Sequence, residues 1–237
     1  MVVKSPLNSR TLTIDDNNMS QVVDEAAEEL LAGGLVVYPT DTSYGLACDP
    51  RQEGAIERLI DAKERRRDLG VPLLFADMKQ CEPYHEFLDL ERVLTRLFWP
   101  GPLTLVVSPQ QDVSNLISGG RGSILIRVPG HQIPREIARK IEAPIVGTSA
   151  NKSGGPSPYT VSEAEEQLGN EVDLYIDAGP SSSEKDSTII GVQEEDDSSI
   201  IKIYREGELS VAQLNNVLKG DTEALRFWTN RIVYANM

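Results

Sequence analysis

The chain has 237 residues, of which 40% are hydrophobic, so it can bury a core as one large domain or as one domain with a short appendage. It contains no uninterrupted apolar run of about 18 residues and no signal-peptide layout at its N-terminus, so we expect a cytoplasmic protein without membrane association. The formal net charge of −14 argues against strong direct nucleic-acid binding, because broad nucleic-acid-binding surfaces owe most of their affinity to basic residues.

The predicted elements alternate between helices and strands along the chain. Apolar residues recur with helical spacing over residues 22–31, and the β-prone run Leu35–Tyr38 follows. A later helix should begin near Ser162, which has capping-box spacing to Glu165. Further helices are expected at about residues 56–63 and before Phe98. Further strands are expected at residues 72–75, 103–107, 124–128, 174–176 and 200–204, with a polar acidic loop between the last two.

This order of elements predicts the fold class and the domain boundaries. The helical segments are too irregular for strict βαβ alternation, so we predict one α/β (α+β) domain with a mixed sheet. We place that domain at residues 20–210. Residues 1–19 would form an N-terminal arm, and residues 211–237 would form a short helical tail that is too small to fold alone.

The cysteines and histidines give little indication of catalysis. Cys48 and Cys81 are far apart and lack CxxC spacing, so we expect two small buried hydrophobic residues rather than a disulfide or a zinc site. His131 follows Pro129-Gly130 at a predicted helix start, and we interpret it as a surface or capping residue. We therefore predict no metal ion held by protein side chains.

The sequence also lacks the common motifs of nucleophilic catalysis and nucleotide binding. GxSxG and HExxH are absent, which argues against acyl-enzyme chemistry and a zinc peptidase. Neither a Walker loop nor GxGxxG occurs, so any nucleotide must be held by a different device.

Polar residues gather at four places where strands or helices end, which is where side chains converge on the ligand crevice of an open sheet. Hydroxyl and amide groups can bind an amino acid, and Lys and Arg can neutralise phosphate charge. Each cluster also has a purely structural interpretation, as a capped turn, a solvated helix end, a salt-bridged strand residue or an Asx turn. The clusters are residues 40–44, Lys63 with Arg65–Arg67, Arg127, and residues 148–151 with Ser153 and Ser157.

Together, seven segments resemble the signatures of the YrdC/TsaC family, in the family's order. The resemblance extends over roughly residues 20–210 and is specific because the segments are in register. The segments are Tyr38-Pro39-Thr40-Asp41-Thr42 with Tyr44-Gly45-Leu46, Lys63-x-Arg65, Trp99-Pro100-Gly101-Pro102-Leu103-Thr104, Arg127-Val128-Pro129, Thr148-Ser149-Ala150-Asn151 with Ser153-Gly154 and Ser157-Pro158, Asp186-Ser187-Thr188, and Ile203-Tyr204-Arg205-x-Gly207.

The resemblance implies a short, single-domain threonylcarbamoyl-AMP synthase with a twisted mixed sheet and flanking helices around a concave cavity. Such an enzyme uses ATP, L-threonine and bicarbonate, and it releases pyrophosphate. Its product would pass to a tRNA threonylcarbamoyl-transferase complex for the N6-threonylcarbamoyladenosine modification of tRNA. Mg²⁺ would accompany ATP and be held mainly by the phosphates.

Site residues follow from the resemblance position by position. Lys63, Arg65, Ser149 and Asn151 would be catalytic. ATP would be bound by Lys63, Arg67, Ser123, Ser149, Asn151, Ser157 and Arg205. Threonine would be bound by Thr40, Arg127, Gly147 and Ser187.

Two departures from the family pattern leave parts of this assignment open. The loop Glu64–Val71 is longer than usual, so the sequence does not decide which arginine of Arg65–Arg67 contacts phosphate. Ala76 replaces a histidine that some members carry near the threonine site. Two alternative functions are a non-catalytic RNA-binding module, which the negative charge disfavours, and a carbamoyl-transfer enzyme of hydrogenase maturation, whose accompanying acylphosphatase and zinc-finger segments this sequence lacks.

Overall fold

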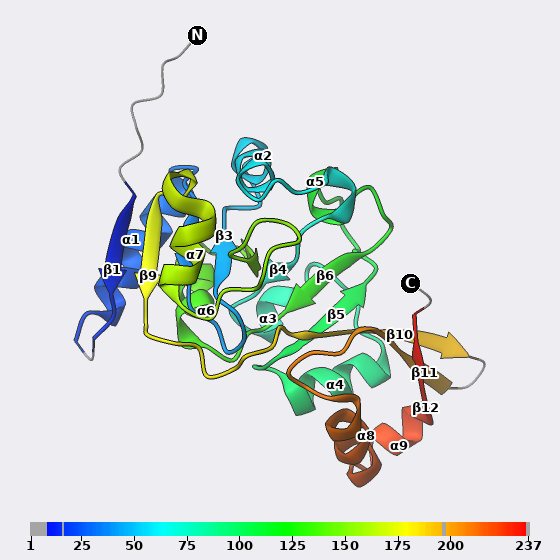
Figure 1. The fold of residues 1–237 in the computed structure, drawn as a ribbon. Helices are drawn as coiled ribbons and strands as arrows, with labels where there is room; N and C mark the ends of the chain where they lie inside the picture. Colours follow the sequence, from blue (N-terminus) through cyan, green and yellow to red (C-terminus); the bar gives the residue numbers. More distant parts are fainter. Residues whose placement is uncertain (1–8, 16, 196–197, 236–237) are drawn as a thin grey trace.

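The computed structural model describes residues 9–15, 17–195 and 198–235. It confirms the predicted mixed α/β fold, in which helices cover the faces of mixed sheets (Figure 1). The strands divide between two sheets instead of the single sheet that the sequence suggested. No helix in the described part of the chain is long and apolar enough to cross a membrane.

The first sheet combines parallel and antiparallel pairs. Residues 36–38 form its central strand. The pairs on one side of this strand, which involve residues 174–177 and 10–13, are parallel. The pairs on the other side, which involve residues 45–47 and 148–149, are antiparallel. One edge strand comes from residues 10–13, so part of the predicted N-terminal arm belongs to this sheet, whereas residues 1–8 lie outside the described part. In spatial order the strands are β1 (Arg10–Thr13), β9 (Leu174–Asp177), β2 (Val36–Tyr38), β3 (Gly45–Ala47) and β8 (Thr148–Ser149).

The second sheet is larger and contains the predicted strand at residues 103–107 near its centre. In spatial order its strands are β12 (Trp228–Tyr234), β11 (Ser198–Arg205), β10 (Thr188–Glu195), β5 (Leu103–Val107), β6 (Ile124–Arg127), β4 (Leu73–Leu74) and β7 (Ile145–Val146).

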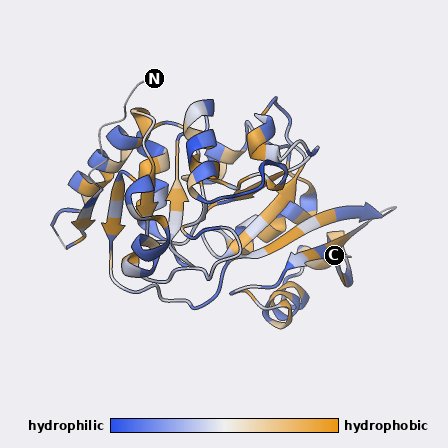
Figure 2. Cartoon of the chain, turned by 45° about the horizontal axis from the view of Figure 1, so that its top comes forward, coloured by the Kyte–Doolittle hydropathy of each residue, from blue (hydrophilic) through white to orange (hydrophobic). Residues whose placement is uncertain are grey.

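Helices surround both sheets, and apolar side chains fill the space between them. The helices are α1 (Met19–Leu31), α2 (Glu53–Ala62), α3 (Met78–Cys81), α4 (Asp89–Phe98), α5 (Asn115–Ser118), α6 (Gln132–Lys140), α7 (Val161–Leu168), α8 (Val211–Gly220) and α9 (Ala224–Phe227), with 3-10 turns at Arg67–Leu69 and Gly169–Glu171. The hydrophobic residues concentrate on the strands and on the inner helix faces (Figure 2). Cys48 and Cys81 are fully buried and unpaired, as expected.

Strand β10 corrects the prediction of a polar acidic loop between residues 176 and 200. Its first half pairs in parallel with β5, and its whole length pairs with β11. The half beside β5, Thr188–Gly191, is largely buried and rich in β-branched residues, whereas the strand ends in Glu194-Glu195, and its projecting end is hydrophilic (Figure 2). The acidic residues at the end of this strand made the segment resemble a polar loop in the sequence.

The C-terminal segment is also only partly helical. After α8 and α9, residues 228–234 form β12, which extends the second sheet by pairing in parallel with β11. The prediction of a helical tail missed this strand. Its aromatic and β-branched residues, such as Trp228, Ile232 and Val233, favour an extended strand once a sheet edge is available.

A buried ion pair between His85 and Glu91 connects the loop before α4 to the helix itself. Nε2 of His85 lies 2.7 Å from the Glu91 carboxylate, and Nδ1 lies 2.8 Å from the carbonyl oxygen of Ser108. Both ring nitrogens therefore face acceptors, which favours the doubly protonated ring. Burial is the largest single effect and disfavours the charged ring, but the hydrogen bond and negative charge of Glu91, together with the Ser108 carbonyl group, outweigh it and raise the pKa of His85.

We predict that this ion pair makes stability depend on pH. A histidine whose pKa is raised by folding stabilises the protein fully below its unfolded pKa of about 6.5, and this contribution is lost as pH rises through the folded value. The difference in unfolding free energy between wild type and His85→Gln should therefore shrink as pH rises above about 6.5. Urea denaturation at each pH measures it. A difference that does not change with pH would contradict the charged pair.

His131 provides the matched control for this experiment. Its Nδ1 accepts a hydrogen bond from the Ile133 amide at the start of α6, as the predicted capping role requires, and burial lowers the pKa of His131. His131→Asn keeps a capping oxygen. Because the shift has the opposite sign, the difference between wild type and His131→Asn should grow as pH rises through about 6.5.

Candidate active site

The polar clusters predicted from the sequence meet in one cavity between the two sheets. The first sheet contributes residues at β2, β3 and β8, and the second contributes residues of β4, β5, β6, β10 and β11. Residues far apart in the sequence therefore share one surface, which is rich in hydroxyl groups and arginines. The polar residues that line it are Thr40, Thr42, Ser43, Arg65, Thr104, Arg127, Thr148, Ser149, Asp186, Ser187 and Arg205.

Arg127, the last residue of β6, is held on three sides and is only 5% exposed. Its Nε donates to the Gly101 carbonyl oxygen at 2.8 Å, Nη1 donates to Thr42 Oγ1 at 3.0 Å, and Nη2 donates to Asp41 Oδ1 at 2.6 Å. A guanidinium has five N–H donors, so two remain for a ligand. The pair with Asp41 compensates a charge that would be costly to bury alone.

The turn after β2 positions these partners of Arg127. The Thr40 hydroxyl donates to the Ser43 carbonyl oxygen at 2.6 Å and accepts from the Thr42 amide at 2.9 Å. This closes the turn between β2 and β3 with a side chain, as threonine often does in turns. Thr42 is thereby fixed beneath the guanidinium of Arg127.

Lys63 follows α2 and is fully buried beneath the loop after β8. Its Nζ donates to the carbonyl oxygens of Ser149 and, at 2.6 Å, of Asn151. The carbonyl oxygen of Lys63 accepts from the Ser153 amide at 2.8 Å. Side chain and backbone of Lys63 therefore both hold this loop. Burial, together with the positive charge of Arg65, lowers the pKa of Lys63 to about 7.

Within that loop, the predicted serine and asparagine contact each other. Ser149 Oγ donates to Asn151 Oδ1 at 2.5 Å, and Asn151 Nδ2 donates to the Gly155 carbonyl oxygen at 2.8 Å. Ser149 is the member of the pair that reaches the cavity.

Asp186 joins three segments on the opposite side of the cavity. Its Oδ1 accepts from Ser43 Oγ at 2.7 Å, and its Oδ2 accepts from Ser157 Oγ at 3.0 Å and from Arg205 Nη1 at 3.4 Å. Arg205 also donates from Nε and Nη2 to the Ser187 carbonyl oxygen at 3.0 and 2.8 Å. These bonds place Ser187 and Arg205 side by side in the wall.

A family model that groups Sua5, YciO and YrdC proteins, described as "Telomere recombination", matches residues 28–207. The chain belongs to this family. A threonylcarbamoyl-AMP synthase of Idiomarina loihiensis is 36% identical over 169 residues, which are 70% of this chain and 91% of that protein. A putative threonylcarbamoyl-AMP synthase of Mycobacterium tuberculosis is 34% identical over 212 residues, which are 89% of this chain and 95% of that protein.

A solved structure of the Sua5/YciO/YrdC family has the same fold. The crystal structure of P. abyssi Sua5 complexed with L-threonine aligns with a TM-score of 0.83 at 29% identity. The alignment covers 94% of this chain but only 62% of the P. abyssi protein. The resemblance inferred from the sequence motifs is thus confirmed at the level of family and fold.

The residues predicted to bind ATP are brought together only in part. Ser149 and Arg205 line the cavity, together with Arg65, which was predicted to be catalytic, and Lys63 and Asn151 lie directly behind Ser149. Two others are more distant from the centre of the cavity. Ser157 contacts Asp186 at its edge, and Ser123 lines a neighbouring cavity that shares Leu125 and Ile189 with the main one.

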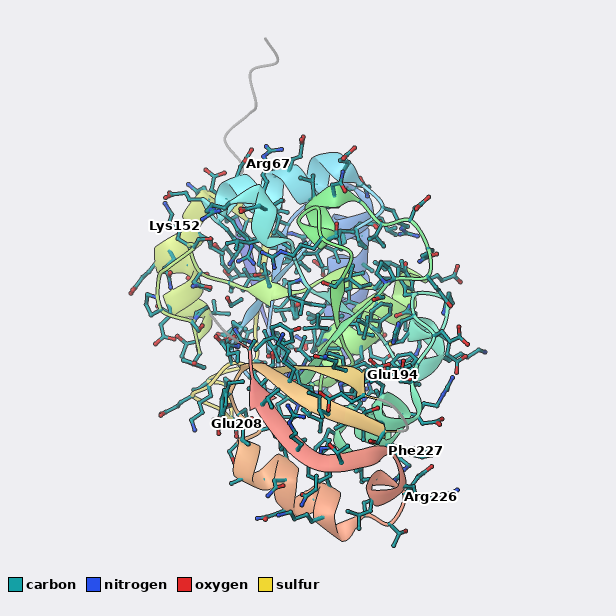
Figure 3. The ribbon with its side chains drawn as sticks, turned by 90° about the vertical axis from the view of Figure 1, so that its right-hand side faces the viewer. Arg67, Lys152, Glu194, Glu208, Arg226 and Phe227 are labelled. Atoms are coloured by element: carbon teal, nitrogen blue, oxygen red, sulfur yellow. The ribbon has the colours of Figure 1, made fainter. Side chains whose placement is uncertain are left out.

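The long loop after Lys63 presents Arg65, and not Arg67, to the cavity. Arg65 Nε donates to the Gly70 carbonyl oxygen at 3.0 Å, which fixes its guanidinium in the wall. Arg67 begins a 3-10 turn, is 54% exposed and pairs with Glu57 and Asp61 of α2 on the outer surface (Figure 3). We therefore replace Arg67 with Arg65 in the predicted phosphate-binding set.

The four residues predicted to bind threonine all line the same cavity: Thr40, Arg127, Gly147 and Ser187. Ser187 Oγ lies 2.9 Å from the Thr104 hydroxyl and accepts from Arg205 at 3.1 Å. Gly147 admits no side chain, because a Cβ there would lie 2.2 Å from Leu74 Cγ. These residues lie together, although their ligand remains a prediction.

Sequence reasoning assigned no role to several residues that build the site. Asp41 and Asp186 stood inside the family-like segments, but nothing in the sequence showed that they pair with Arg127 and Arg205. Thr104 and Tyr38 line the cavity and were likewise passed over. The sequence feature that could have identified each of these residues was its position within a family-like segment near the end of a strand.

We predict that ATP binding takes up a proton at Lys63. With a pKa of about 7, much of the free enzyme carries a neutral amine at about pH 8, and a nearby triphosphate favours the charged form. Uptake should therefore approach one proton at about pH 8 and fall toward about pH 6, where the amine is already charged. Calorimetric titrations in buffers of different ionisation enthalpy measure it.

The control for this titration is Lys63→Ala, which should still fold and should lose the proton uptake. Equal binding enthalpies for the wild type in all buffers at about pH 8 would contradict a shifted lysine in contact with the nucleotide.

Proposed function

We propose that this chain is a threonylcarbamoyl-AMP synthase, which forms threonylcarbamoyl-AMP and pyrophosphate from L-threonine, bicarbonate and ATP. The observation that carries the proposal is the single cavity that contains two unused N–H donors of Arg127 together with Ser149, backed by Lys63. The relatives named threonylcarbamoyl-AMP synthase and the P. abyssi Sua5 complex with L-threonine support it.

Threonine fits the end of the cavity at Arg127. Its carboxylate would accept the two remaining N–H groups of Arg127, which lie in a fixed guanidinium plane. Hydroxyl groups of Ser187 and Thr104 are near enough to take part in orienting the polar atoms of the amino acid. Leu74 and Pro72 offer an apolar wall for the methyl group.

ATP fits the end at Ser149. In the reaction, the threonine amine and bicarbonate form a carbamate with loss of water, a carbamate oxygen attacks the α-phosphorus, and the bond to the pyrophosphate oxygen breaks. Lys63 and Arg65 would stabilise the charge that builds on the phosphates, and the cavity would hold the two anions at attacking distance. The contribution of the protein is therefore positioning and charge stabilisation.

Mg²⁺ would enter with the nucleotide. Asp186 is the one carboxylate among the lining residues, and its oxygens already accept from Ser43, Ser157 and Arg205. Within the described ranges, no group of three or more His, Cys, Asp or Glu residues could hold a metal ion. This set of residues fits an ion that is coordinated mainly by phosphate oxygens and water and that neutralises part of their charge.

The product would be used elsewhere. Threonylcarbamoyl-AMP is a mixed anhydride that transfers its acyl group, and we propose that a tRNA threonylcarbamoyl-transferase complex in the cytoplasm consumes it. The net charge of −14 opposes a broad contact between this chain and tRNA itself.

Pyrophosphate release tests the activity directly. We expect release from ATP only when both L-threonine and bicarbonate are present, and we expect mass spectrometry to detect the carbamoylated adenylate. Release that ignores threonine, or none from folded protein, would contradict the synthase. Salt-dependent RNA binding without turnover would favour the RNA-binding alternative. Turnover with carbamoyl phosphate in place of bicarbonate would favour the carbamoyl-transfer alternative.

Arg127→Ala should act on threonine more than on ATP. Loss of a carboxylate clamp is expected to raise the KM for threonine by about 10-fold or more, with the KM for ATP changed by less than about twofold. Steady-state pyrophosphate release measures both. Arg67→Ala is the matched control, since its side chain pairs with α2 outside the cavity, and it should leave both constants unchanged. Equal increases for both substrates in Arg127→Ala would mean that Arg127 supports the cavity as a whole.

A further inference from the structure

Tyr38 carries a buried hydroxyl group that the protein leaves without a partner. Its side chain is fully buried, and its hydroxyl is one of two buried side-chain polar atoms in the described ranges that make no hydrogen bond; the other is Asp41 Oδ2. Other buried tyrosines are satisfied: Tyr44 donates to the Gly179 carbonyl oxygen at 2.6 Å, and Tyr175 donates to the Gly169 carbonyl oxygen at 2.8 Å. An unpaired buried hydroxyl is destabilising, so its retention calls for a ligand.

The register of the first sheet shows where this hydroxyl points. Tyr38 of β2 is paired with Gly45 of β3, and Gly45 is paired with Ser149 of β8. Residues directly opposite each other in antiparallel strands face the same side of a sheet. All three residues line the cavity, so Tyr38 and Ser149 face it from either side of a glycine.

Gly45 is what lets the ring lie across the sheet. A Cβ at this position would lie 2.5 Å from Cζ of Tyr38 and 2.6 Å from its hydroxyl oxygen. The end of the ring therefore rests directly on the backbone of Gly45. The hydroxyl is carried from β2 toward β8, where Ser149 marks the nucleotide end of the cavity.

The environment of the hydroxyl favours an anionic acceptor. Burial raises the pKa of Tyr38, and the positive charge of Arg127 only partly offsets this, so the hydroxyl keeps its proton and acts as a donor. A donor next to a cationic side chain binds an anionic oxygen most strongly. It lies between Arg127, where the threonine carboxylate would sit, and Ser149, beside the phosphates.

We propose that Tyr38 forms the subsite for the carboxyl group that originates from bicarbonate, and that its hydroxyl donates a hydrogen bond to the carbamate of N-carboxythreonine. This rests on the proposed function. In that reaction the carbamate is the one group bonded to the threonine nitrogen on one side and to the α-phosphorus on the other. The Tyr38 hydroxyl binds the carbamate oxygen that does not attack, and it remains protonated throughout, so no atom is transferred to or from the tyrosine.

Tyr38→Phe tests the subsite, because it removes the hydroxyl and keeps the ring over Gly45. We expect the apparent KM for bicarbonate to rise, or kcat to fall, so that kcat/KM for bicarbonate drops about 10- to 100-fold, the scale of one hydrogen bond to a charged group. Binding of threonine alone and of ATP alone, measured by calorimetry, should change by less than about twofold. The melting temperature should stay the same or rise, because an unsatisfied buried hydroxyl is removed.

Tyr175→Phe is the matched control. It also removes a buried tyrosine hydroxyl, but this one is bonded to Gly169 and lies outside the cavity. Its melting temperature should fall, and its bicarbonate dependence should equal that of the wild type. A weaker response to bicarbonate with unchanged or higher melting temperature in Tyr38→Phe, and the reverse in Tyr175→Phe, would distinguish a ligand contact from a structural role.

Two results would overturn the subsite. An unchanged bicarbonate dependence in Tyr38→Phe would show that the hydroxyl does not contact the carbamate. A loss of affinity for threonine alone or for ATP alone would assign the hydroxyl to that substrate instead. Failure of the proposed function is recognised separately, since the wild type itself would then show no pyrophosphate release dependent on threonine and bicarbonate.

Discussion

The burial of Lys63 under the loop after β8 is the constraint on which the site depends. An ammonium group with only carbonyl oxygens as partners is expensive to bury, and no carboxylate in the described part of the chain forms an ion pair with Lys63. The same contacts join the end of α2 to the segment that carries Ser149 and Asn151. The Lys63 side chain is thus placed to interact with an anionic ligand, and in the free protein it fixes the conformation of the loop after β8.

The charges around the cavity are arranged against the balance of the whole protein. Acidic residues outnumber basic ones by 37 to 23, yet four cationic side chains, Lys63, Arg65, Arg127 and Arg205, converge on or behind one wall. Asp41 pairs with Arg127 and Asp186 pairs with Arg205, whereas Lys63 and Arg65, at the end assigned to the phosphates, form no ion pair among the described residues. The positive potential in the cavity therefore attracts small anions, whereas the negative net charge of the whole protein repels large polyanions.

Much of the fold was predictable wherever local signals bounded an element on both sides. The strand at Leu103–Val107 was predicted over the residues that β5 occupies, because Pro102 precedes it and Ser108-Pro109 follows it. The start of α7 was less certain. We predicted a capping box formed by Ser162 and Glu165, but the structure uses Thr160 and Glu163, which have the same spacing two residues earlier.

The site was predictable in its residue types but not in its contacts. Arg127 and Asp41 are separated by 86 positions, and only the closing of the two sheets brings them within 2.6 Å. Nothing in the run Arg65-Arg66-Arg67 indicates which guanidinium turns inward, because that depends on the Gly70 carbonyl group and on the acids of α2. The division of the strands into two sheets is likewise a property of long-range pairing, which no short segment encodes.

The close approach of Tyr38 to Gly45 has a consequence for how such sequences can diverge. Because the ring occupies the space that any side chain at position 45 would need, the two positions are not free to change independently. A descendant that acquired alanine at 45 would have to displace the ring or exchange the tyrosine for a smaller residue, and in either case the hydroxyl would leave its present position. The pair should therefore be inherited together, or be lost together in lineages whose cavity has turned to another substrate.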